Sequence, residues 1–165
     1  MSNYNQISSF IWNVCDDVLR GLFKPHEYGD VILPFTVLRR LDCTLESHKD
    51  EVYEIYEKYK SQVDDPTPII LNKINTNFFN HSKYDLTRLK SDPQNINLNF
   101  QNYIGGYSDN VVEIIENFQF DKPVQKLHKS NRLYQLIDKF TEVDLHPDVI
   151  SNRDMGIIFE ELLRK

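Results

Sequence analysis

Four basic side chains in the second half of the sequence are spaced so that they could act together on one ligand. Lys122, Lys126, Lys129 and Arg132 are separated by four, three and three positions, so they share one face if this segment is a continuous helix. A row of positive charges with this spacing can follow the phosphates of a nucleic acid. It can also be a solvated helix face, which is the commoner role of a charged stripe. The sequence leaves both interpretations open.

A second basic pair, Arg39 and Arg40, lies within an apolar stretch. We expect these two arginines to pair with acidic neighbours or to line the edge of a partner interface, rather than to contact DNA.

No residues with the spacing of a catalytic, metal or cofactor site are found. The five histidines are scattered and form no HExxH motif, and no serine lies in a GxSxG motif. The Gly105-Gly106 pair lacks the other residues of a dinucleotide or phosphate loop. Cys15 and Cys43 have no CxxC spacing, so we expect reduced cysteines without zinc. The sequence therefore predicts no catalytic, metal-binding or cofactor-binding residue.

These side chains are expected to lie on helices. Apolar residues at intervals of three and four predict a helix over 7–19, ended by Gly21, and a central helix over 31–45. We expect Asp30 to cap the central helix and Pro34 to lie in its first turn.

The rest of the chain also has mostly helical spacing. Further helices are predicted over 52–63, 70–79, 86–89, 96–104, 111–118, 124–127, 133–140 and 154–165, with Ser108 as the cap of the fifth of these. The break at 64–68 is too short to be a clear domain boundary. We therefore predict one compact multi-helix all-α domain spanning 1–165. A small β-hairpin in the Asn-rich middle stays open, because short apolar runs fit both strands and helices.

The net charge of −6 opposes a protein coated with positive charge for nucleic acid, so any DNA contact must be local. The sequence has neither a signal-peptide pattern nor an apolar segment near the roughly 18 residues that span a bilayer. We expect a cytoplasmic protein without a membrane partner.

The last predicted helix has no stop signal. Its apolar residues are still in phase at Leu163, and no Gly, Asn or Pro follows. This pattern favours a chain that continues; the alternative is a natural C-terminal helix with a charged last turn.

Four segments resemble a known family: FIWNVCDDVLRG, EYGDVILPFTVLRRLD, YIGGYSDNVVEIIENFQF and DLHPDVISNRDMGIIFEELLRK. Together they span nearly the whole chain. The chain resembles the N-terminal helical domain of the modification subunit of type I restriction-modification systems, a DNA adenine-N6 methyltransferase.

The resemblance implies that a catalytic domain binding S-adenosylmethionine follows the helical domain. The family's glycine-rich loop and Asn-Pro-Pro-aromatic motif do not occur here, so we expect no catalysis and no cofactor binding by these residues alone. The implied role is subunit assembly and clamping of DNA. The implied partners are DNA, a specificity subunit, a second modification subunit and a restriction subunit. The alternative hypothesis is a free-standing helical adaptor that binds only proteins, as the acidic net charge allows.

Overall fold

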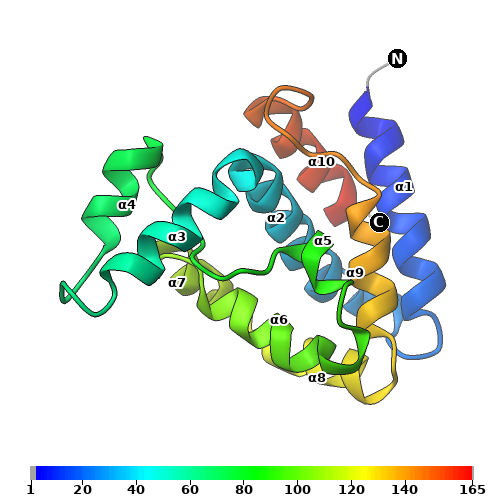
Figure 1. Ribbon diagram of the computed structural model, residues 1–165. Coiled ribbons are helices and arrows are strands. Elements are labelled where there is room, and N and C mark those ends of the chain that lie inside the picture. The colour runs from blue at the N-terminus through cyan, green and yellow to red at the C-terminus, as the bar shows by residue number, and fades with distance from the viewer. Residues whose placement is uncertain (1–2, 165) are drawn as a thin grey trace.

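The computed structural model describes residues 3–164 and consists of helices joined by short loops (Figure 1). The helices are α1 (Asn3–Leu19), η1 (Pro25–Glu27), α2 (Gly29–Leu45), η2 (Glu46–His48), α3 (Lys49–Tyr59), α4 (Thr67–Ile74), α5 (Leu86–Leu89), η3 (Pro93–Asn95), α6 (Ile96–Gly105), α7 (Asp109–Asn117), α8 (Asp121–Lys129), α9 (Leu133–Thr141) and α10 (Asn152–Arg164), where η marks a 3-10 helix. Within residues 3–164 no strand forms, and β-pairing is limited to two isolated bridges. The prediction of an all-α domain is confirmed, and the hairpin left open in the Asn-rich middle does not form.

Helix α2 is central, as its apolar spacing predicts. It packs against α1, α8, α9 and α10. Its Phe35 is fully buried, and the ring centroid lies 5.8 Å from that of Phe100, 5.0 Å from that of Phe120 and 5.5 Å from that of Phe140. Because these three rings come from α6, the turn before α8, and α9, one side chain joins segments far apart in the sequence.

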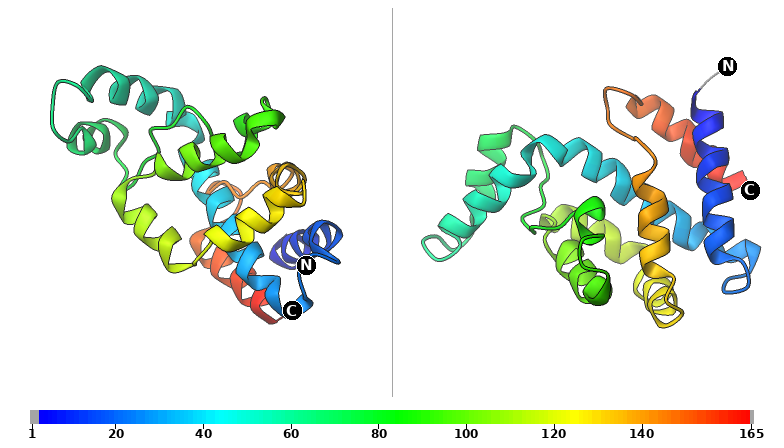
Figure 2. Two further views of the ribbon diagram at one scale, coloured as in Figure 1. Left: turned by 90° about the horizontal axis from the view of Figure 1, so that it is seen from below. Right: turned by 45° about the vertical axis from the view of Figure 1, so that its right-hand side comes forward.

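The helices are arranged on two sides of α2. Helices α1, α9 and α10 lie together at one end, whereas α3 and α4 project at the other (Figures 1 and 2). In the part of the chain described here, no helix has the length and apolar character needed to cross a membrane.

The start of α2 differs from the prediction. The carbonyl of Tyr28 accepts the N–H groups of Val31 and Ile32 at 3.0 and 2.8 Å, so the helix begins at Gly29 and Asp30 lies inside it. Asp30 is therefore not the cap, and Pro34 falls beyond the first turn. The main chain of Tyr28 closes the first turn without any side-chain cap.

Two predicted helices are shorter than expected. Helix α3 ends at Tyr59, and α4 ends at Ile74 because Asn75 adopts a left-handed conformation with φ of 57°. Phe78 and Phe79 therefore lie in the following loop and not in a helix.

That loop is bonded to the turn before α7. The Ser108 N–H donates to the Phe79 carbonyl at 2.9 Å, and the Phe79 N–H donates to the Ser108 hydroxyl at 3.1 Å. The His81 N–H donates to the Gly106 carbonyl at 2.8 Å. Ser108 directly precedes α7, as predicted, but its hydroxyl caps no N–H of that helix.

Gly106 leaves no room for a side chain, so Gly106→Ala is expected to destabilise the fold. An added Cβ would lie 2.7 Å from the Asn80 Oδ1 and 2.8 Å from the Ser82 main-chain nitrogen. Crowding of this kind costs about 1–3 kcal/mol. The control is Gly105→Ala, where nothing lies within 4 Å of the added Cβ and alanine favours the helix. Urea unfolding of both variants checks this, and equal stabilities would contradict the packing argument.

Candidate nucleic-acid interface

Three of the four predicted basic residues lie on one exposed face of α8. Val124 and Leu127 are buried and hold the helix against the core. Lys122, Lys126 and Lys129 follow at intervals of four and three on the opposite side and are exposed. The predicted spacing therefore gives a real row of three ammonium groups.

The fourth member, Arg132, leaves the row. Helix α8 ends at Lys129, and Asn131 has a φ of 59°, which turns the chain before α9. The Arg132 guanidinium donates to the carbonyls of Val18 and Arg20, both at 3.1 Å. Because it satisfies carbonyl groups at the C-terminal end of α1, Arg132 has a structural role and does not belong to the row.

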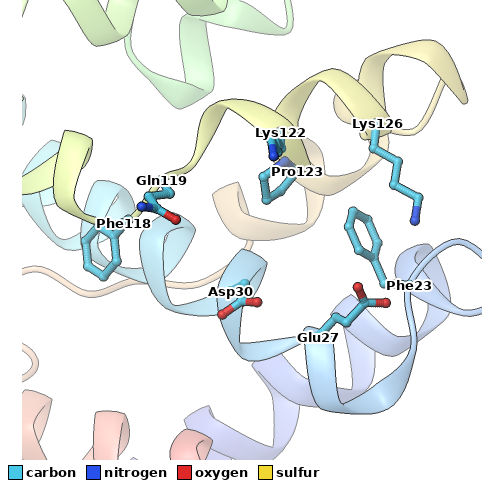
Figure 3. A pocket seen from close by; sticks show the side chains of 8 residues that line it. All are labelled: Phe23, Glu27, Asp30, Phe118, Gln119, Lys122, Pro123 and Lys126. Atoms are coloured by element: carbon cyan, nitrogen blue, oxygen red, sulfur yellow. The ribbon is translucent and has the colours of Figure 1, made fainter.

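Beside the row, α8 faces the turn that leads from α1 into α2. Figure 3 shows a hollow with Lys122 and Lys126 on one side and Phe23, Glu27 and Asp30 on the other. The Lys126 ammonium lies 4.7 Å from the centroid of the Phe23 ring, a cation–π contact. This contact positions Lys126 but leaves its ammonium group exposed to solvent.

The turn adds basic groups that sequence reasoning missed. The Glu27 carboxylate accepts the Lys24 N–H at 2.8 Å. This hydrogen bond lowers the pKa of Glu27, and the charges of Lys126, His26 and Lys24 lower it further. The sequence signal for these groups is the short run KPHE, Lys24 to Glu27, between α1 and α2. Lys24 and His26 are therefore near enough to extend the basic surface of α8.

Two hollows beside α8 differ in charge. The hollow between α8 and the turn is mixed, since Glu27 and Asp30 face the lysines across it. A second, shallower hollow on α8 has all three lysines of the row and one carboxylate, Asp121. The outer face of α8 is thus the more positive surface, and we call its Lys122, Lys126 and Lys129 the lysine row.

The other predicted pair, Arg39 and Arg40, points into the segment between α9 and α10. The Arg39 Nε donates to the Val143 carbonyl at 2.7 Å. The Arg40 guanidinium donates to the carbonyls of Leu145 and Ile150 at 2.8 and 2.6 Å, and burial lowers its pKa.

These partners are carbonyl groups, whereas the sequence favoured acidic neighbours. The carbonyls belong to an irregular segment, so they have no helix or strand to satisfy them. The two arginines therefore fix the approach to α10. A contact of either residue with another subunit stays a prediction.

One buried polar cluster was missed entirely. The Asp42 carboxylate, 7 % exposed, accepts hydrogen bonds from the hydroxyls of Tyr103 and Tyr107 at 2.5 and 2.8 Å and from the Leu86 N–H at 2.8 Å. Burial raises the pKa of Asp42 to about 6, although these hydrogen bonds oppose the rise. The cluster joins α2, α5, α6 and the turn before α7. Asp42 also lines a hollow beside Arg39 and Arg88. Both of its carboxylate oxygens accept hydrogen bonds from within the cluster, so the cluster is a structural feature.

The family model of the HsdM N-terminal domain matches residues 7–140, which include α2, the lysine row and most of α9. No curated protein and no solved structure matches the chain. The match covers most of the sequence and agrees with the helical fold. The chain therefore belongs to the HsdM N-terminal domain family, the N-terminal domain of the modification subunit of type I restriction-modification systems.

Proposed function

We propose that the lysine row contacts the sugar-phosphate backbone of duplex DNA and that the domain helps methyltransferase subunits close around it. The observation that carries this proposal is the row itself, three exposed ammonium groups along one helix face. Phosphate contacts position a protein on DNA without reading sequence. Because the net charge of the domain is −6, a DNA contact has to be confined to a local basic face such as this one.

The family suggests what the rest of the complex supplies. In this proposal a separate catalytic domain, which follows residues 1–165, binds S-adenosylmethionine and methylates adenine at N6. A specificity subunit reads the DNA sequence, and a second modification subunit and a restriction subunit complete the assembly. Membership of the modification-subunit family supports these assignments.

A purely protein-binding role is the second candidate. The carboxylates of Glu27 and Asp30 beside α8 favour it, because negative charge repels a phosphate backbone. In that case the lysines would be a solvated face.

The double variant Lys126→Gln/Lys129→Gln separates the two candidates. In the assembled methyltransferase we expect its affinity for duplex DNA to fall. We also expect the slope of log K against log salt to become shallower by about two, since each phosphate contact contributes about 0.9. Fluorescence anisotropy of a labelled duplex over a salt series measures both quantities.

The matched control is Lys58→Gln/Lys73→Gln, which removes the same charge from exposed positions on α3 and α4. It should leave the slope unchanged. If the α8 variant also keeps the wild-type slope, the DNA contact is wrong and the protein-binding role replaces it.

A further inference from the structure

A second polar surface lies at the other end of the molecule, between α3, the loop after α4, and α6. Its central feature is a pair of stacked rings: the imidazole of His81 lies parallel to the Tyr56 ring, with centroids 3.6 Å apart and an interplanar angle of 3°. We call this surface the His81 face. The residues used below are Tyr53, Tyr56, Lys60, His81, Lys83 and Asn102, all of which line one hollow.

The loop that carries His81 is held rigidly. The Asn80 side chain accepts the Ser82 N–H at 2.8 Å and donates to the Tyr103 carbonyl at 2.9 Å. The Lys49 ammonium, almost fully buried, donates to the same Asn80 Oδ1 at 3.1 Å. Together with the close packing on Gly106, these bonds fix the backbone on both sides of His81.

A rigid loop keeps His81 and Lys83 in place before any ligand arrives. Ordering of a loop is a main cost of binding, and here the fold itself supplies that order. The His81 face is therefore preorganised.

Two lysines that line the hollow lie close to tyrosine rings. The Lys60 ammonium lies 5.9 Å from the Tyr56 ring centroid, and the Lys83 ammonium lies 5.2 Å from that of Tyr84. Lys60 also forms an ion pair with Glu57, so the hollow has two cations and one anion among its charged residues. Burial lowers the pKa of His81, so its imidazole is neutral at pH 7 and acts as a flat stacking surface.

We propose that the His81 face binds an unpaired nucleotide of a single-stranded nucleic acid. The base packs against the His81–Tyr56 ring pair, and the lysines lie beside the phosphate. The Tyr53 hydroxyl and the Asn102 amide supply hydrogen bonds to base or sugar. Aromatic rings next to lysines are the common means of binding single strands without sequence preference.

A duplex cannot stack a base on the ring pair, because its bases are stacked on each other and their faces are covered. A protein partner would find tyrosines here too, but the two lysines that line the same hollow match a phosphate better than an apolar side chain. The proposal does not depend on DNA contact by the lysine row.

The test is a titration of the protein with a short labelled oligothymidylate and with a duplex of the same length. The single strand is expected to bind at the His81 face, so its affinity should respond to changes at His81 while the affinity for duplex should not. His81→Leu should weaken binding of the single strand about tenfold, the typical effect of losing one base–aromatic stack. His81→Phe keeps a flat ring and should retain most of the affinity.

Lys83→Gln is a second variant that should leave the fold intact, because Lys83 is exposed. It is expected to weaken single-strand binding and to reduce its salt dependence, whereas Lys73→Gln on α4 should change neither. An equal loss of single-strand and duplex affinity in His81→Leu would overturn the proposal. So would wild-type binding by both His81→Leu and Lys83→Gln. A loss seen only in Lys126→Gln/Lys129→Gln would assign the single strand to the lysine row and would likewise overturn it.

Discussion

Replacing Phe35 by alanine is expected to lower the free energy of unfolding by about 3–5 kcal/mol. The ring is fully buried and contacts the rings of Phe100, Phe120 and Phe140. Its removal loses apolar burial and leaves a cavity that rings from three different segments cannot all close. Because each partner belongs to a different segment, the loss is felt across the whole domain and not in one helix.

Thermal unfolding followed by circular dichroism measures the effect. A change of this size should lower Tm by about 10 °C, since 1 kcal/mol shifts Tm by roughly 2–4 °C in a chain of this length. The matched control is Phe10→Ala, in which the same ring is removed from a position that is 38 % exposed. Its cost should be well under half as large. Equal shifts in Tm for both variants would show that Phe35 is not the centre of the core.

The sequence predicted the long helices because their apolar residues are regularly spaced. Helices α1, α2 and α9 follow from this pattern, and Gly21 ends the first, as its positive φ of 82° requires. The predicted start of α2 was wrong because the main-chain carbonyl of Tyr28 closes the first turn, and a main-chain group leaves no signal in the residue types. Such an end cannot be seen in residue types.

The basic row was predicted in part for a related reason. The spacing of Lys122, Lys126 and Lys129 depends only on one helix, so sequence is enough. Arg132 depends on a turn at Asn131 and on carbonyl groups of α1 that are more than a hundred residues away in the chain. Arg39 and Arg40 were likewise identified as unusual, but their partners lie in a distant irregular segment.

Asp42 did leave a signal that was not used. Phe35, Leu38 and Leu45 are buried on one stripe of α2, and Asp42 falls on the same stripe, four residues after Leu38. A carboxylate at a buried helix position requires hydrogen-bond donors, so the sequence implies a polar cluster there. The identity of its donors, Tyr103 and Tyr107, comes only from the fold.

Asp42 is therefore expected to make stability depend on pH. Its pKa is about 6 in the folded protein and 3.8 for the free group, so between these values the folded state binds more protons than the unfolded state. Stability from this group is largest below about pH 4 and falls as pH rises through about 6. The difference of about two pKa units corresponds to about 3 kcal/mol.

The variant Asp42→Asn isolates this effect. Its amide oxygen can still accept the Leu86 N–H, and its nitrogen can donate to the hydroxyl oxygens of Tyr103 and Tyr107, which also bond each other at 2.8 Å. Urea unfolding of both proteins should show the variant gaining about 2–3 kcal/mol relative to wild type as pH rises from about 4 to about 7.

Other titrating groups do not confuse this comparison. Carboxylates with lowered pKa values, such as Asp16 beside Arg20, are present in both proteins and cancel in the difference. Burial lowers the pKa of Lys49 to about 8, although the Asp42 charge opposes this, so Asp42→Asn should lower that pKa further. The comparison therefore ends at about pH 7, below the pKa of Lys49 in the wild type. A stability difference that stays constant with pH would mean that Asp42 keeps an ordinary pKa. The tyrosine hydroxyls and the Leu86 N–H would then stabilise the buried carboxylate fully, and burial would no longer dominate its energy.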